Sequence, residues 1–317
     1  ELYSPDTDTW SFIQSMREAR IGATLTRLGD GRLLIAGGES SGVPSATLEI
    51  FDPASLTFSM VRGSMATPRK AHAATVLRDG RVLIAGGSDG SAVLNTADIF
   101  DPAEGSILAA SNMSVPREGL SATLMDNGRV LVAGGSNGEA DLASTEYFDG
   151  TLRKFSPAPD MDIPRRGHLA FLMPHNNTVV IAGGTSNGAP VTSALQFGWW
   201  GNNYKGEFRK LGDLSVGRTQ ATAAASDQGE LTMAGGVSGG AIRSATESLK
   251  TATVATNKLD YQPGDTVYLS GSGFQPGEAV RVTIHETPPP GIPRYAWRYC
   301  GHHCRLSLIH ISEPTRL

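Results

Sequence analysis

The stretch Asp79-Gly80-Arg81-Val82-Leu83-Ile84-Ala85-Gly86-Gly87 decides the fold, because it recurs along the chain. Copies occupy residues 30–38, 127–135, 177–184 and, in a weaker form, 228–236. In the clearest copies an Asp-Gly or Asn-Gly pair supplies the positive φ of a hairpin turn, and the apolar run after it is typical of a strand. The second glycines lie at 38, 87, 135, 184 and 236, so the steps are 49, 48, 49 and 52 residues. Such a period predicts a repeated supersecondary unit.

Outward from this stretch, each unit carries a second pattern of an acid, a hydrophobic residue, an aromatic residue, Asp and Pro. It occurs as Glu49-Ile50-Phe51-Asp52-Pro53 and as Asp98-Ile99-Phe100-Asp101-Pro102, and in part at residues 146–149. The segment Ala71 to Leu77 predicts a strand before the Gly-Gly strand, and a short strand follows the Asp-Pro turn. Four short strands in about 50 residues indicate a propeller blade.

These motifs, with a Met-x-x-x-Arg motif ahead of each unit, resemble the kelch-repeat family. The resemblance is closest to the bacterial secreted subgroup with a galactose-oxidase-like central domain, and it covers roughly residues 1–250 in five units. It implies an all-β fold, a kelch-type β-propeller of four-stranded blades. Glu1 to Phe12 has the pattern of the back half of a unit. We therefore expect an N-terminally truncated propeller at residues 1–252, with a native blade number of five, six or seven left open.

Bulk composition excludes some classes of protein. The 27 basic and 31 acidic residues form no basic stripe, so nucleic acid is not an expected partner. No apolar run approaches the roughly 18 residues that a membrane span needs. The 38 glycines are spaced as turn residues. Both cysteines, Cys300 and Cys304, lie near the C-terminus, so the propeller has no disulfide framework.

From about Thr253 the chain changes character. Tyr261-Gln262-Pro263-Gly264-Asp265-Thr266-Val267 and Gly271-Ser272-Gly273-Phe274-Gln275-Pro276-Gly277-Glu278 resemble the opening strands of bacterial surface immunoglobulin-like domains. Val280, Val282 and Ile284 alternate as half-buried strand residues do. About 35 residues are present where a complete domain needs roughly 100. We expect residues 253–287 to be a partial immunoglobulin-like domain.

Residues 288–317 are predicted to be a non-native or disordered tail. Cys300-Gly301-His302-His303-Cys304 contains zinc-ligand residue types, but no second ligand pair stands at a finger-like spacing. Leu306-Ser307-Leu308-Ile309-His310-Ile311-Ser312-Glu313-Pro314-Thr315-Arg316 resembles the translation of a sequencing-library adapter. We expect no metal here and no cofactor elsewhere.

One arginine precedes the first strand of each unit, and an acid recurs in the third strand. In a propeller the first strand lines the central channel, so these arginines would ring one mouth and form a funnel for an anionic ligand. Alternatively, each arginine pairs with its acid as a structural, bidentate contact, which we favour because nearly every arginine has an acid. The arginines are Arg20, Arg69, Arg117, Arg165 (or Arg166) and Arg218, and the acids are Glu49, Asp98, Glu146 and Glu247, with Gln196 breaking the series.

Two histidines and one set of loops are further candidates. His72 and His168 recur three residues after an arginine, which favours packing over catalysis. The loops after the Gly-Gly strands vary while the strands do not, as expected of a scaffold that presents a binding surface. In one of them Asn137, Glu139 and Asp141 are candidate ligand contacts, and calcium and turn formation both remain open as their role.

The fourth unit carries an aromatic insertion, Gln196-Phe197-Gly198-Trp199-Trp200-Gly201-Asn202-Asn203-Tyr204. We favour a lengthened outer turn whose tryptophans pack on the blade edge. The alternative is an exposed platform, with Trp199, Trp200 and Tyr204 contacting a carbohydrate or a protein.

The functional prediction is a non-catalytic recognition module of a secreted or cell-surface bacterial protein, with a protein or glycan ligand on the loop face or at the channel mouth. The alternative is a carbohydrate-active or copper-radical-oxidase-like enzyme whose catalytic residues lie outside these residues. Copper radical oxidases cross-link a tyrosine to a cysteine, and the propeller has no cysteine. A purely structural stalk is the third possibility.

Overall fold

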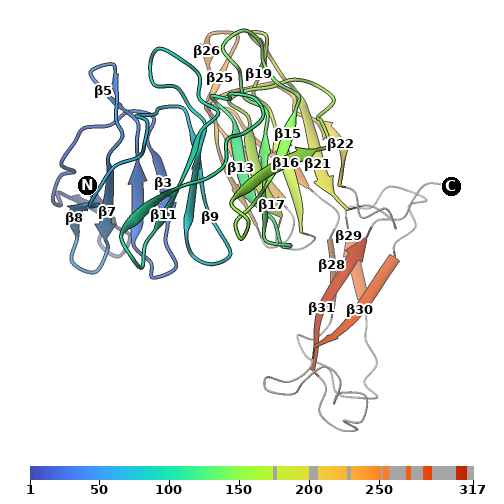
Figure 1. Cartoon of the computed structure of the whole chain (residues 1–317). Helices are drawn as coiled ribbons and strands as arrows, with labels where there is room; N and C mark the ends of the chain where they lie inside the picture. The colour runs from blue at the N-terminus through green and yellow to red at the C-terminus, as the bar shows by residue number, and fades with distance from the viewer. Residues whose placement is uncertain are drawn as a thin grey trace.

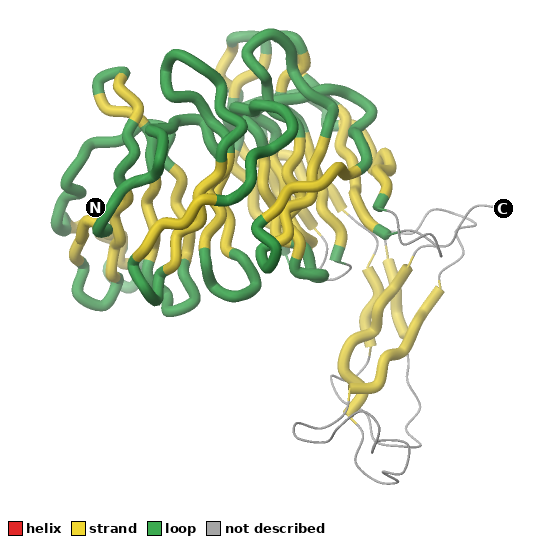
Figure 2. The backbone as a smooth tube through the Cα atoms, viewed as in Figure 1, coloured by secondary structure: helices red, strands yellow, loops and turns green. Residues whose placement is uncertain are grey.

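The computed structural model describes residues 1–173, 177–199, 206–226 and 230–250, and the backbone of four further strands. Every regular element in these residues is a β-strand (Figure 2). The strands form antiparallel sheets that lie side by side in chain order (Figure 1). The all-β prediction is confirmed.

Four sheets have four strands each and are the first to fourth blades. The first blade contains β3 (Thr24–Arg27), β4 (Leu33–Ala36), β7 (Leu48–Asp52) and β8 (Thr57–Met60). The second contains β9 (Ala73–Val76), β10 (Val82–Ala85), β11 (Ala97–Asp101) and β12 (Ser106–Ala109). The third contains β13 (Ser121–Leu124), β14 (Arg129–Ala133), β15 (Thr145–Asp149) and β16 (Lys154–Ala158). The fourth contains β17 (Leu169–Met173), β18 (Thr178–Ala182), β21 (Ser193–Gly198) and β22 (Glu207–Asp213).

The fifth blade has three described strands, and the chain begins with a separate hairpin. The fifth blade contains β23 (Thr222–Ala225), β24 (Glu230–Ala234) and β27 (Thr246–Lys250). The first hairpin pairs β1 (Leu2–Ser4) with β2 (Thr9–Ser11). In the fifth blade β27 pairs with β24 as the third strand, so β1 does not occupy that position.

Short hairpins extend the loops between the second and third strands of three blades. They are β5 (Glu39–Ser40) with β6 (Val43–Pro44), β19 (Thr185–Ser186) with β20 (Ala189–Pro190), and β25 (Val237–Ser238) with β26 (Ala241–Ile242). Figure 1 shows β5, β19, β25 and β26 at the same end of the blades. We call this end the loop face.

The hydrophobic core lies between consecutive blades. The inner strands β3, β9, β13, β17 and β23 contact one another in that order. Each interface pairs a large residue of one blade with an alanine of the next, as Leu34 does with Ala74 and Leu83 with Ala122. Since each sheet buries its apolar side chains against its neighbours, the architecture is a five-bladed β-propeller of four-stranded blades.

Four strands lie beyond the propeller, and only their backbone is described. β28 (Thr253–Thr256) pairs with β29 (Leu269–Ser272), and β30 (Arg281–Thr287) pairs with β31 (Arg305–Ser312). Most of the predicted immunoglobulin-like segment lies outside the described residues, so that assignment stays a prediction. β31 falls within residues 288–317, whose predicted non-native origin is likewise untested, and Cys300 to Cys304 lie outside the described residues.

Candidate functional site

The repeated arginines lie inside the blades, with side chains at most 1% exposed. In the second blade, Arg69 Nη1 donates to the carbonyls of Gly86 (2.9 Å) and Thr96 (3.0 Å). Its Nη2 binds Asp98 at 2.6 Å and Thr96 Oγ1 at 3.3 Å. One planar guanidinium therefore ties the end of the second strand to the start of the third.

The third blade repeats this arrangement. Arg117 Nη1 donates to the carbonyls of Gly134 (3.0 Å) and Ser144 (2.8 Å), and Nη2 binds Glu146 at 3.1 Å. In the fifth blade Arg218 reaches the carbonyls of Gly235 and Ala245 and pairs with Glu247. The spacing from arginine to acid, 29 residues, is the same in each case.

The backbone of the same arginines binds the preceding blade. Gly38 N–H of the first blade donates to the carbonyl of Arg69 (3.0 Å), and Arg69 N–H donates to the carbonyl of Ser45 (3.0 Å). Gly87 and Leu94 of the second blade contact Arg117 in the same way, at 2.7 and 3.0 Å. A Cβ on Gly86 would lie 2.4 Å from the Arg117 carbonyl, so this close approach requires glycine.

Arg69, Arg117, Arg165 and Arg218 therefore each hold their own blade by the side chain and the preceding blade by the backbone. We call this pair of contacts the arginine clip. It explains why Met-x-x-x-Arg and Gly-Gly recur together: the glycines make room for the next blade's arginine backbone. The Nη donors of Arg69 and Arg117 bond to carbonyl and carboxylate oxygens within their own blades.

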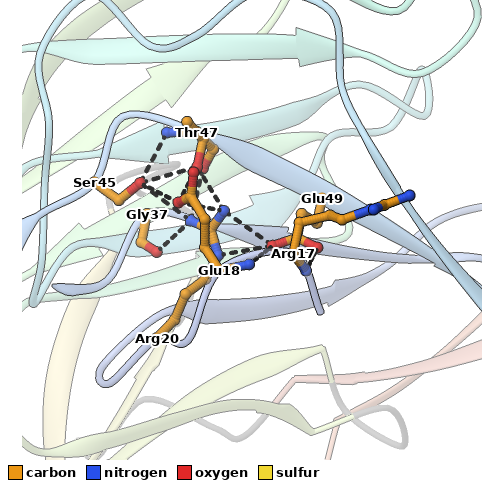
Figure 3. Close-up of polar contacts among 7 residues, drawn as sticks. All are labelled: Arg17, Glu18, Arg20, Gly37, Ser45, Thr47 and Glu49. Carbon is orange, nitrogen blue, oxygen red and sulfur yellow. Dashed lines mark hydrogen bonds and ion pairs between the residues drawn. The ribbon is translucent and has the colours of Figure 1, made fainter. Parts of the chain in front are cut away.

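The first blade adds a second carboxylate to its clip (Figure 3). Arg20 binds Glu49 at 3.2 Å and Glu18 at 3.1 Å. Glu49 also accepts backbone N–H bonds from Arg17 (2.7 Å) and Glu18 (3.2 Å). The hydroxyl of Thr47 donates to Glu18, and this bond holds the pKa of Glu18 below its usual value. The side chain of Glu18 is 39% exposed, whereas that of Glu49 is fully buried.

The fourth blade shows why the acid series breaks. The pairing of β18 with β21, which has no register shift, places Leu195 opposite Ile181, where the second blade has Asp98 opposite Ile84. Leu195, and not Gln196, therefore occupies the position of the acid. Gln196 donates to Thr178 Oγ1 instead (2.8 Å).

Arg165 nevertheless keeps a carboxylate partner. Asp162, three residues earlier, lies 3.4 Å from Arg165 Nη2. Its side chain is 47% exposed, whereas Glu146 in the third blade is 4% exposed. The fourth clip therefore takes its acid from the loop before the first strand.

Burial governs the charges at the clips. It lowers the pKa of Arg69, Arg117 and Arg165, and in the first two the facing acids Asp98 and Glu146 oppose this effect. A guanidinium stays cationic in proteins, so each clip is a buried ion pair. Removing one partner of such a pair strongly destabilises the fold, because it leaves the other charge buried and unpaired.

His72 and His168 lie in blade interfaces. His72 Nε2 is 2.9 Å from Thr24 Oγ1 of the first blade, and His168 Nε2 is 2.8 Å from Ser121 Oγ of the third. The Nδ1 atoms of both rings are buried without a hydrogen-bond partner. Burial, assisted by the nearby Arg69 and Arg165, lowers both pKa values to about 3. Both rings are therefore neutral at physiological pH and pack between blades.

On the loop face, two of the three candidate residues are engaged internally. Asn137 Oδ1 accepts the N–H groups of Glu139 (2.9 Å) and Ala140 (2.8 Å), which is an Asx turn. Asp141 accepts Asn187 N–H of the next blade (2.6 Å) and pairs with Arg166 at 3.3 Å. Glu139 is exposed.

Of the aromatic candidates, Trp199 is partly buried. It packs on the core cluster between the third and fourth blades, with its ring 5.6 Å from Phe197. Trp200 and Tyr204 lie outside the described residues. The packing of Trp199 agrees with the lengthened outer turn.

Sequence reasoning missed the ion pairs that cross blades on the loop face. Lys70 of the second blade lies 2.6 Å from Glu39 of the first, and Arg166 lies 3.3 Å from Asp141 of the third. The available signal was a charge directly after the repeated arginine.

Among the described residues, no group of three or more His, Cys, Asp or Glu side chains is placed to hold a metal ion. No helix in the described part is suited to cross a membrane.

Comparison with known proteins agrees with the geometry. Residues 69–106, from the second arginine to the start of β12, match the family model described as the kelch motif. With the five blades, this match supports a kelch-repeat propeller. A search of curated proteins finds no match.

Proposed function

We propose that this propeller is a non-catalytic recognition module whose loop face binds a protein. The kelch propeller is commonly a protein-binding scaffold, and that association supports binding in general. The observation that carries the proposal is the contrast between the clips and the loops. The clips and glycines repeat from blade to blade, while the loops at residues 39–44, 88–93, 136–141, 185–190 and 237–242 share a length of six residues and differ in sequence.

The loops are also held in fixed shapes. Asp89 Oδ1 accepts the N–H groups of Ser91 (2.8 Å) and Ala92 (2.7 Å), as Asn137 does in the next blade. At two loop tips, Val43 is 68% and Ile242 is 89% exposed. Exposed apolar side chains on loops with fixed backbones reduce the entropy lost on binding. A protein ligand is favoured because these tips offer apolar anchors.

The test compares the wild-type chain with Val43→Asp and Ile242→Asp as bait. Proteins captured from the source of the chain should be lost with either variant and retained with Leu152→Asp, since Leu152 is 66% exposed on an outer turn of the third blade. Equal capture by all four baits would contradict a loop-face site. A glycan array with the same baits tests the carbohydrate alternative.

A secreted or cell-surface bacterial location is part of the proposal. It is supported by the resemblance of residues 253–287 to surface immunoglobulin-like domains. Protease accessibility on intact source cells tests it: cleavage of the chain without lysis is expected, and protection until lysis would contradict it.

A further inference from the structure

Three Asn-Gly dipeptides lie in turns of the propeller: Asn127-Gly128, Asn137-Gly138 and Asn187-Gly188. An asparagine followed by glycine can lose its side-chain amide without an enzyme, because glycine has no Cβ to hinder attack by its own backbone nitrogen. That reaction uses two groups, the N–H of the glycine and the side-chain amide of the asparagine. The hydrogen bonds of these two groups therefore decide which dipeptide reacts.

In the first two dipeptides both groups are held by hydrogen bonds. At the first, the glycine N–H donates to the carbonyl of Met125 (2.9 Å), and the asparagine Oδ1 accepts the N–H of Arg129 (3.0 Å). At the second, the glycine N–H donates to Ser136 Oγ (3.2 Å), and the asparagine Oδ1 accepts the N–H groups of Glu139 (2.9 Å) and Ala140 (2.8 Å). These bonds must break before either dipeptide can react.

The third dipeptide is held much less. It forms the two-residue turn between β19 and β20 on the loop face (Figure 1), with φ +48° at Asn187 and +83° at Gly188, as in a type I′ hairpin. Among the described residues its hydrogen bond runs from the Asn187 N–H to Asp141, which leaves the Asn187 side chain and the Gly188 N–H unbonded. Both residues are exposed, and a Cβ on Gly188 would meet no atom within 4 Å. The two reacting groups are therefore open to water.

The hairpin that carries this turn is also short. β19 and β20 have two residues each, so few backbone bonds oppose a change in the shape of the turn. Segments with few such bonds open locally at small cost in free energy. The Gly188 nitrogen can therefore approach Cγ of Asn187 without any change in the four-stranded sheet of the blade.

We propose that Asn187 is a site of spontaneous deamidation, and that it reacts selectively among the three dipeptides. The Gly188 N–H gives its proton to water or hydroxide, and the nitrogen forms a bond to Cγ of Asn187. The bond from Cγ to Nδ2 breaks, and the side-chain nitrogen leaves as ammonia with a proton from the solvent. Water then opens the resulting succinimide at either carbonyl carbon, which gives aspartate or isoaspartate without oxidation or reduction.

The product changes the loop face. Residue 187 gains one negative charge at neutral pH, because a side-chain carboxyl group has a pKa of about 4. The new carboxylate belongs to the residue whose N–H donates to Asp141 (2.6 Å), and Asp141 pairs with Arg166 (3.3 Å). In isoaspartate the main chain also gains one CH₂ group within the two-residue turn. These changes occur whether or not the loop face binds a protein, so the inference does not rest on the proposed function.

The test incubates the full chain in mildly alkaline buffer and follows the three asparagines by mass spectrometry of peptides. Asn187 should convert at least about tenfold faster than Asn127 and Asn137, because two or three hydrogen bonds hold each of the slower sites. In urea, where the chain is unfolded, the three rates should converge. Labelling of the aged chain by an isoaspartate methyltransferase should place the methyl group mainly at residue 187.

Ser136→Ala is the matched control, because it removes the acceptor of the Gly138 N–H. It should speed the conversion of Asn137 about fivefold and leave the rate at Asn187 unchanged, with thermal unfolding as the check that the variant folds. Comparable rates at the three asparagines in the folded chain would overturn the proposal. Selectivity for Asn187 that persists in urea would also overturn it, since the folded structure would then not be the cause. An unchanged rate at Asn137 in the variant would remove the hydrogen-bond argument on which the proposal rests.

Discussion

Removing the guanidinium of Arg117 tests the arginine clip most sharply. Arg117→Ala leaves the carboxylate of Glu146, 4% exposed, with Ser114 N–H as its remaining donor. It also leaves the carbonyls of Gly134 and Ser144 without their side-chain donor. Breaking a buried ion pair by removing one partner costs about 3–5 kcal/mol. The retained Ser114 bond places the expected loss near the lower end of that range.

The assay is urea or thermal unfolding of wild type and variant. At about 2–4 °C per kcal/mol for a domain of this size, the expected fall in Tm is roughly 6–12 °C. Arg32→Ala is the matched control, because Arg32 pairs with Asp30 at a surface turn where both side chains are exposed. An exposed pair contributes about 0–1 kcal/mol, so this control should unfold near the wild-type Tm.

The double variant Arg117→Met/Glu146→Leu removes both charges and keeps apolar side chains in their place. It therefore distinguishes the contribution of the ion pair to stability from that of side-chain packing. It should be more stable than the sum of the two single variants predicts, with a coupling of about 1–3 kcal/mol. Equal Tm values for Arg117→Ala and Arg32→Ala would refute the clip. Loss of ligand binding without loss of stability would restore the anion-funnel interpretation.

Three further predictions follow from the interfaces. The folded-state pKa of His72 and His168 is about 3, below the ordinary 6.5, so the unfolded chain binds more protons between these values and stability falls as pH falls. Between pH 7 and 5 the free energy of unfolding, measured with urea, should fall by about 2 kcal/mol per histidine. His72→Gln should halve the slope of unfolding free energy against pH. An unfolding free energy that does not change with pH would contradict this. Ala71 has φ +54°, a left-handed conformation that strains an alanine, and Gly119 and Gly167 occupy the same position in other blades. Ala71→Gly should therefore raise the free energy of chemical unfolding by about 0.5–1 kcal/mol. A lower unfolding free energy would show that Ala71 is not strained. Asp162→Asn should destabilise by about 1 kcal/mol, less than Arg117→Ala, because Asp162 is half-exposed. Asp213→Asn, in a pair with both side chains exposed, should have almost no effect, and equal effects of the two variants would remove Asp162 from the clip.

The blades were predictable because their signals are local and repeated. Asp-Gly turns, apolar runs and Gly-Gly pairs at a period near 49 residues predict hairpin strands, and each occurrence supports the others. The pairing of Arg69 with Asp98 was also predictable, since an acid recurs at a fixed distance from the arginine.

Other features depend on geometry that composition does not record. Gln196 is the polar residue nearest to the acid position, but the pairing of β18 with β21 gives that position to the apolar Leu195. The compensating Asp162 lies in a different element, where no repeat signal exists. The positive φ of Ala71 was hidden because alanine rarely adopts it. The double role of the clip was also hidden, because its contacts to the preceding blade use the backbone.

The central claim is that Arg69, Arg117, Arg165 and Arg218 each join two consecutive blades. Couplings across hydrogen bonds in solution NMR, between the amide nitrogen of one residue and the carbonyl carbon of another, test it directly. The account predicts a coupling from Gly87 N to Arg117 C′, together with the strand couplings between β10 and β11. Strand couplings without the Gly87–Arg117 coupling would contradict it, because the blades would then form without the clip between them.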